Sequence, residues 1–182
     1  MKNLRIATRY AKALLSLAEE NGILEEAYES MSAVLEVFEK NKELKVILRS
    51  PIVRESKKTG IIKSIFEKKI NDLILKYLLI ITRKKRSYLI EPIAIEYKRL
   101  HNLKLNIETV VVITAGEIDD EIRNKVMQVA RKITDKEIRM ENKIDPSIIG
   151  GFILTIGDYY YDASVKRSLS NLKKKLYHSI EW

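Results

Sequence analysis

The sequence predicts a two-part fold: a bundle of six helices over residues 1–105, followed by a small α+β domain over residues 106–182. In the first part, apolar side chains recur every three or four residues, which is the spacing of amphipathic helices. From Asn106 to Ala115 they alternate with period two instead, as in a β-strand. The charge changes at the same place, because residues 1–105 carry 22 Lys and Arg against 13 Asp and Glu, whereas residues 106–182 carry 12 of each.

The first expected helix has two adjoining apolar stripes. One is formed by Ile6, Tyr10, Ala13 and Leu17, and the other by Ala7, Ala11, Leu14 and Ala18. Asn21-Gly22 then favours a left-handed helix C-cap. The remaining helices are expected around Leu24–Phe38, Leu44–Leu48 (ended by Pro51), Ile61–Phe66, a fifth capped by Asn71 or Asp72, and Leu89–Leu100. Pro92 must lie in the first turn of the last of these helices or kink it.

The second part is expected to be βαββ plus a final helix. The strand Asn106–Ala115 has apolar residues on both sides in its middle, which predicts burial on both faces. Asp119 is placed to cap a helix that carries Ile122, Val126, Val129 and Ile133. A strand over Glu137–Ile144 follows this helix.

Several classes of chemistry are excluded by composition. The chain has no cysteine, so it has no disulfide and no thiolate site, as is usual in a reducing compartment. Its two histidines, His101 and His178, lie in no metal-ligand spacing. Gly150-Gly151 lacks the Lys-Ser/Thr of a phosphate loop and leads into a strand, so a bulge or a close backbone approach is the expected role. We therefore expect no catalytic residue, cofactor, metal or small-molecule ligand.

The run Arg83-Lys84-Lys85-Arg86 raises an alternative function. Four adjacent cations can neutralise phosphates, so a basic helical module that binds nucleic acid is the rival hypothesis. The interleaved aromatic residues and recognition helix of known nucleic-acid modules are missing, however. A solvated loop between two helices accounts for the same run.

The segment Ile144–Leu176 is the most informative part of the chain. Gly157-Asp158 supplies a two-residue hairpin turn between an apolar strand and Tyr159–Tyr161. Asp162 and Ser164 are good N-caps for the final helix. That helix carries Val165, Leu169, Leu172 and Leu176 at helical spacing, together with Lys166, Arg167, Lys173, Lys174 and Lys175.

These residues resemble the C-terminal signature of the delta subunit of the F-type ATP synthase, a family that includes the oligomycin-sensitivity-conferring protein. The matching positions are Ile144-Asp145, Gly150, Gly151, Gly157, Asp158, Asp162, Ser164, Val165 and Lys166. Arg9–Leu14 (RYAKAL) is similar to the opening helix of that family. The resemblance implies a non-catalytic stator subunit that links the alpha/beta catalytic head to the peripheral stalk and so couples rotation to ATP synthesis.

The resemblance also implies two partners. A groove between the first and fifth helices would receive the N-terminal helix of an alpha subunit, and it would involve Ala7, Tyr10, Ala11, Leu14, Ile74, Leu78 and Ile81. Packing inside the bundle is the alternative role of the small residues. If the groove is correct, Ala11→Asp should release the head and leave the protein folded.

The second part would bind the b subunits of the stalk, with Lys166, Arg167, Lys173 and Lys174 as candidate contacts; ordinary solvation is the alternative. The turn that commonly reads Asn-Gly-Arg in the family is Lys84-Lys85-Arg86 here. The family-like motif starts near residue 9, so no removable leader is expected. We therefore expect a peripheral protein on the cytoplasmic face of a bacterial membrane, or an organelle-encoded equivalent.

Overall fold

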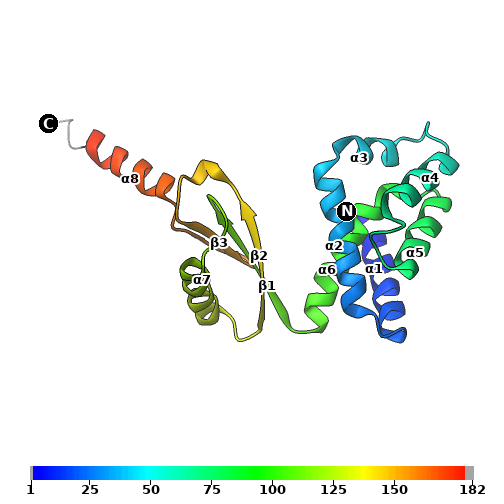
Figure 1. The fold of residues 1–182 in the computed structure, drawn as a ribbon, viewed down its shortest axis with the longest axis horizontal. Helices are drawn as coiled ribbons and strands as arrows, with labels where there is room; N and C mark the ends of the chain where they lie inside the picture. The colour runs from blue at the N-terminus through cyan, green and yellow to red at the C-terminus, as the bar shows by residue number, and fades with distance from the viewer. Residues whose placement is uncertain (1, 179–182) are drawn as a thin grey trace. The chain divides into compact units, whose positions relative to one another are not determined.

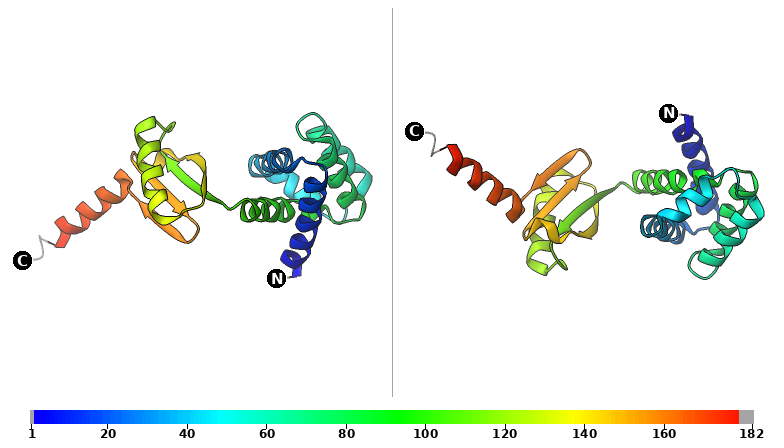
Figure 2. Two further views of the ribbon diagram at one scale, coloured as in Figure 1. Left: turned by 90° about the horizontal axis from the view of Figure 1, so that it is seen from below. Right: turned by 90° about the horizontal axis from the view of Figure 1, so that it is seen from above.

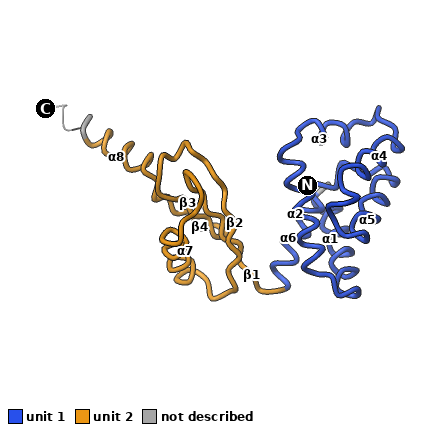
Figure 3. Tube along the Cα trace, viewed as in Figure 1, with its two compact units in different colours: residues 1–104 blue, residues 105–182 orange. Residues whose placement is uncertain are grey.

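The computed structural model describes the backbone of residues 2–178 and the side chains of residues 4–175. The chain divides into two compact units, residues 1–104 (unit 1) and residues 105–182 (unit 2), which Figure 3 shows in separate colours. Unit 1 is helical and unit 2 combines a sheet with helices, so the predicted order of a helical region and an α+β domain is confirmed. Within the described residues, no helix is both long and apolar enough to cross a membrane.

Unit 1 consists of helices joined by short turns (Figure 1). They are α1 (Lys2–Glu20), α2 (Leu24–Lys40), α3 (Lys42–Arg49), α4 (Glu55–Phe66), α5 (Asp72–Arg83), the 3₁₀ turn η1 (Ser87–Leu89) and α6 (Ile90–Lys104). The predicted boundary signals act as expected. Gly22 adopts a left-handed φ of 67° after α1, and the Asn71 side chain accepts a hydrogen bond from the Leu73 backbone N–H at 2.8 Å.

The small-residue stripe of α1 faces the core of unit 1. Ala7, Ala11 and Ala18 have no exposed surface, and α1 packs closely along α6. Alanine has no side chain beyond Cβ, so a helix that packs against this stripe can approach α1 closely. Thr8 donates a hydrogen bond to the Glu96 carboxylate at 3.2 Å, which joins α1 to α6 above this core.

Unit 2 is a sheet with one crossover helix. Its elements are β1 (Ile107–Thr114), α7 (Asp120–Ile133), β2 (Glu137–Ile144), the 3₁₀ turn η2 (Pro146–Ile148), β3 (Phe152–Ile156), β4 (Tyr159–Asp162) and α8 (Val165–His178). The strand order is β2-β1-β3-β4, with β1 and β2 parallel and the other pairs antiparallel. The arrangement is therefore βαβββ. The expected βαββ counted one strand too few, although the sequence predicts both strands of the hairpin.

One face of the sheet carries the core of unit 2. Val110, Val112 and Leu154 are completely buried against α7, which contributes Val126 and Ala130. The Asp119 side chain caps α7 by accepting a hydrogen bond from the Ile122 N–H at 2.7 Å, as predicted. The prediction that the middle of β1 is buried on both faces is wrong. Its other face is only half-buried, because α7 covers one side and α8 extends away from the sheet (Figure 2).

Candidate partner-binding surfaces

The residues expected to line a groove on unit 1 lie mostly in its core. The exposed fractions are 0% for Ala7, Ala11, Leu14, Ile74 and Leu78, and 1% for Ile81. Only Tyr10 of the predicted set reaches the surface, where it is half-buried. Ala11→Asp would therefore place a carboxylate inside the core, so the expectation that this variant stays folded is not supported.

Another set of apolar residues on α1 and α5 is partly buried or exposed. This set, the α1–α5 strip, consists of Ile6, Tyr10, Ala13 and Leu17 on α1 and Leu73, Tyr77 and Ile80 on α5. The two helices are joined here by Tyr77, whose hydroxyl donates to the Tyr10 carbonyl oxygen at 2.9 Å. Burial raises the pKa of Tyr77 well above its usual value, so this hydroxyl remains a neutral donor. Ile80, in contrast, is 53% exposed.

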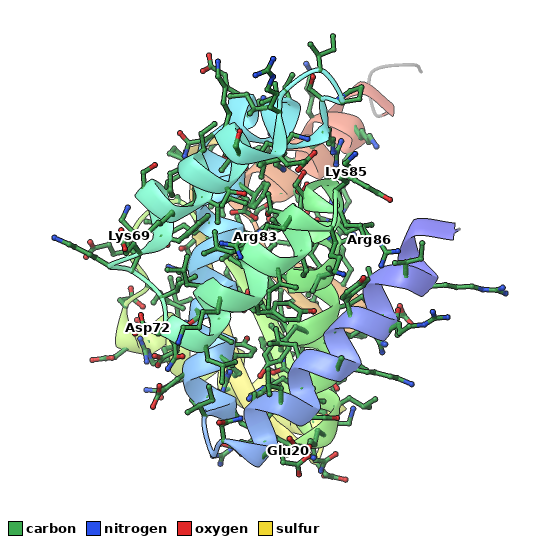
Figure 4. The ribbon with its side chains drawn as sticks, turned by 90° about the vertical axis from the view of Figure 1, so that its right-hand side faces the viewer. Glu20, Lys69, Asp72, Arg83, Lys85 and Arg86 are labelled. Carbon is green, nitrogen blue, oxygen red and sulfur yellow. The ribbon has the colours of Figure 1, made fainter. Side chains whose placement is uncertain are left out.

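Arg86 closes one end of the strip. Its guanidinium lies 5.5 Å from the centre of the Tyr10 ring and donates a hydrogen bond to the Tyr10 hydroxyl. Together with Ile6, Arg9 and Ala13, these two side chains line a hollow of about 380 Å³. Figure 4 looks onto this part of unit 1, with Arg86 beside α1. The contact between the guanidinium and the aromatic ring restrains both side chains, so the hollow is already formed in the isolated subunit.

The basic run forms a tight turn at the end of α5. Lys85 has a left-handed φ of 59°, and its N–H donates to the Thr82 carbonyl at 2.9 Å. The Arg86 N–H donates to the Ile81 carbonyl at 3.1 Å. This is the geometry that glycine favours at a helix C-terminus, so a lysine occupies a strained position here. Arg86, the residue shared with the Asn-Gly-Arg pattern, contacts the hydroxyl and the ring of Tyr10. The run of cations without this contact is therefore shorter than the four residues that the sequence shows.

The glycine pair of the C-terminal segment makes a close backbone approach, as predicted. The Val165 N–H donates to the Gly150 carbonyl at 3.0 Å, and the Ala163 N–H donates to the Phe152 carbonyl at 2.9 Å. Gly151 lies between these bonds with a φ of 73°, and a Cβ at this position would lie 2.3 Å from the Ala163 carbonyl oxygen. Only glycine fits between the two chain segments.

The other signature residues fix the start of α8. Asp162 accepts a hydrogen bond from the Ser164 N–H at 2.9 Å. The Ser164 side chain, and after it this backbone N–H, lowers the pKa of the Asp162 carboxyl. The Ser164 hydroxyl in turn accepts from the Arg167 N–H at 3.2 Å, which makes Ser164 the N-cap. Gly157, with a φ of 53°, and Asp158 form the two-residue turn between β3 and β4. These residues build a rigid support for α8 and form no reactive group.

Helix α8 exposes both its charged and its apolar side chains. Val165, Leu169 and Leu172 are 40%, 51% and 55% exposed. The candidate stalk contacts Lys166, Arg167, Lys173 and Lys174 are also exposed. A hollow of about 820 Å³ lies between η2, β4 and α8 and is lined largely by polar residues. The side chains of Leu176 and His178 lie outside the described residues.

His101, the histidine whose side chain the structure describes, is a packing residue. The His101 side chain is fully buried, its ring centre lies 4.7 Å from that of Tyr28, and its Nε2 is 3.5 Å from a Glu25 carboxylate oxygen. It packs α6 against α2 rather than facing a partner. Across the part of the chain that the structure describes, no group of three or more His, Cys, Asp or Glu residues is arranged to hold a metal ion.

Comparison with known proteins identifies the family. A family model described as the ATP synthase delta (OSCP) subunit matches residues 6–176. The chain belongs to the ATP synthase delta (OSCP) family. It is 35% identical to the ATP synthase subunit delta of Flavobacterium johnsoniae over 97% of this chain and 99% of the relative. It is 33% identical to that of Cytophaga hutchinsonii over 96% of each chain.

A solved structure shares the fold. One chain in the mitochondrial ATP synthase hexamer of Toxoplasma gondii matches with a TM-score of 0.63 and 21% identity, covering 93% of this chain and 96% of the other. Membership in the delta family makes the chain a stator subunit of an F-type ATP synthase and a peripheral part of that membrane-bound complex. The resemblance drawn from the two sequence motifs is thereby confirmed.

Proposed function

We propose that this subunit joins two partners through separate units. Unit 1, with the predicted six-helix bundle spanning residues 1–105, binds the N-terminal helices of the alpha subunits in the catalytic head. Unit 2, spanning residues 106–182, binds the b subunits of the peripheral stalk on the cytoplasmic face of a bacterial membrane, or of an organelle-encoded equivalent. One observation supports this division most directly: each unit has its own buried core and also exposes apolar side chains that its core does not use.

The head contact is assigned to the α1–α5 strip. An amphipathic helix binds in a groove through apolar side chains spaced by three and four residues, and the strip presents complementary residues on two helices. Ala7, Ala11, Leu14, Ile74, Leu78 and Ile81 then form the packed floor beneath the strip, and Tyr10 is the member of that set that contacts the partner. The exposed Ile80 and Leu17 would lose their contact with water on binding, and burial of such side chains drives association.

The stalk contact is assigned to unit 2. Lys166, Arg167, Lys173 and Lys174 would face an acidic surface of the stalk, where opposite charge speeds encounter and fixes orientation. The mechanical role needs no reactive group. The head experiences torque from the rotating shaft, and a link held at two points prevents the head from turning with it. Two attachments within one assembly also raise retention through effective concentration.

The proposal is tested by adding the purified protein to membranes depleted of the delta subunit and measuring ATP-driven proton pumping. The wild-type chain should restore pumping. Ala13→Asp places a charge on the exposed α1–α5 strip and should lower retention of the head on sedimented membranes by about tenfold or more. Ser16→Asp adds the same charge to an exposed position of α1 outside the strip and is the matched control.

Two results would count against the assignment. If Ala13→Asp retains the head as well as Ser16→Asp does, the strip is not the head contact. If the wild-type protein restores no pumping although circular dichroism shows that it is folded, the link function itself is incorrect.

A further inference from the structure

Helix α8 carries an apolar seam that its own unit leaves uncovered. Val165, Leu169 and Leu172 are all between 40% and 55% exposed, although apolar side chains at such spacing normally face a core. Within unit 2, α8 packs mainly against the short turn η2 at its start, and from there it extends away from the sheet (Figures 1 and 2). A helix with this pattern is stable when another helix covers the seam.

The spacing of the seam is that of a coiled coil. Val165, Leu169 and Leu172 follow one another at intervals of four and three residues, and the sequence continues at Leu176 after four more. These are alternating d and a positions over two heptads. The seam is narrow, because the positions beside it are polar. Helices that lie on lipid surfaces instead carry a broad apolar face with Trp or Phe, which α8 lacks.

The flanking positions determine which helix fits. In this register Lys166 and Lys173 occupy e positions, and Ser168 and Lys175 occupy g positions. Residues 165–178 contain five Lys and Arg and no Asp or Glu. In an antiparallel pair of two copies of α8, Lys166 would lie opposite Lys173 of the other copy, and like charges at these positions oppose pairing. The charge pattern therefore favours an acidic helix over a second copy of this chain.

We propose that α8 forms a two-stranded coiled coil with a partner helix that has apolar a and d positions and Asp or Glu at its e and g positions. The inference deepens the proposed stalk contact, and it rests on that function only in taking the partner to be a stalk helix. The apolar seam supplies the stability of the pair, and the lysines supply its selectivity.

The support of α8 adds to this inference. Ser164 caps the helix, Asp162 holds the Ser164 N–H, and the Val165 N–H is bonded to the Gly150 carbonyl. These bonds fix the direction in which the helix leaves the sheet. Because the start of the seam is already ordered, less conformational entropy is lost when a partner helix binds.

The test uses the full-length protein and a labelled peptide of about 28 residues, or four heptads, with Leu at a and d positions and Glu at e and g positions. Its own glutamates keep the peptide from pairing with itself. Fluorescence anisotropy should show binding that weakens as salt rises from roughly 0.05 to 0.3 M. A scrambled peptide of the same composition and a heptad peptide with Lys at e and g should each bind at least about tenfold more weakly.

Variants of the chain identify the surface. Leu172→Asp places a charge on the seam and should abolish binding of the acidic heptad peptide. Ser170→Asp places the same charge at an exposed b position of α8, away from the seam, and should retain most of the binding. Equal binding of the scrambled peptide, or equal loss in both variants, would overturn the proposal. Binding to vesicles of anionic lipid without binding to the heptad peptide would overturn it in favour of a lipid surface.

The failure of this inference is distinguishable from the failure of the proposed function. If Leu172→Asp restores proton pumping in depleted membranes as fully as the wild-type chain does, the stator link stands and the coiled-coil contact is refuted. If the wild-type chain binds the acidic heptad peptide but restores no pumping, the coiled-coil contact stands and the stator link is refuted.

Discussion

Gly151→Ala tests how the C-terminal glycines hold unit 2 together. Gly151 has a φ of 73°, and an added Cβ would lie 2.3 Å from the Ala163 carbonyl oxygen and 3.2 Å from the Ala163 carbonyl carbon. Both obstacles are backbone atoms, so no side-chain rotation relieves the contact. The segment around Ala163 is itself held by the hydrogen bond from its N–H to the Phe152 carbonyl, at 2.9 Å. The methyl group must therefore displace a bonded strand or the start of α8.

The magnitude has two parts. A left-handed conformation costs an alanine about 1–2 kcal/mol. Forcing an extra methyl group into a packed position adds about 1–3 kcal/mol. The sum, about 2–5 kcal/mol, is a large share of the stability of a unit this size, which is roughly 4–12 kcal/mol at the usual stability per residue.

Gly157→Ala is the matched control, because Gly157 also has a positive φ, of 53°, but its added Cβ would come no closer than 3.6 Å to another atom. It should cost only the conformational part, about 1–2 kcal/mol. Hydrogen exchange measured by mass spectrometry follows β1 and β3 separately from the helices of unit 1. Exchange in these strands should rise more in Gly151→Ala than in Gly157→Ala. Equal exchange in the two variants would refute the argument from the backbone contact.

Three further predictions concern local structure. Lys85→Gly removes a left-handed lysine and should stabilise unit 1 by about 0.5–1 kcal/mol in urea unfolding, whereas Lys84→Gly, at a φ of −78°, should destabilise it. Burial, with a smaller effect of Glu25, raises the pKa of Tyr97 from 10 to about 12. The contribution of the neutral Tyr97 side chain to the free energy of unfolding is therefore complete below pH 10 and is lost as the pH rises through 12. Tyr97→Phe should therefore reduce the alkaline loss of stability in this range, by about 2–3 kcal/mol at most, and an unchanged pH profile would contradict this. Ser164→Ala removes the cap of α8 and should raise hydrogen exchange in its first turn, at a cost of about 1 kcal/mol, whereas Ser168→Ala should not.

Local signals in the sequence predicted the elements and their ends. Asn71, Asp119 and Ser164 each accept a hydrogen bond from a backbone N–H at the start of a helix, as their residue types indicate. Gly22 and Gly157 adopt the positive φ that their turns require. These features depend on a few neighbouring residues, so the sequence contains the information needed to place them.

The orientation of the helices could not be predicted in the same way. Both stripes of α1 are apolar, and only packing decides that Ala11 is buried in the core while Tyr10 lies at the surface. Helix α5 is apolar nearly all round, so its sequence gives no indication of which large apolar side chain, here Ile80, is exposed. The hydrogen bond from Tyr77 to Tyr10 connects residues 67 positions apart, and no local pattern signals it. The residues predicted to line a groove on α1 and α5 therefore lie mostly on the buried sides of these helices.

The burial of each α1 residue decides whether its substitution tests binding of the head or folding of unit 1. Ala11 has no exposed surface, and a carboxylate placed there would be surrounded by apolar side chains. An uncompensated buried charge costs several kcal/mol, so Ala11→Asp should lower the thermal midpoint of unit 1 sharply and release the head only because the unit unfolds. Ala13 is exposed on the α1–α5 strip, and Ala13→Asp should keep the helical circular dichroism of the wild-type chain while it loses the head. If Ala11→Asp instead melts with the wild-type protein, α1 does not pack against α6 through this stripe, and the floor of the strip is assigned to the wrong residues.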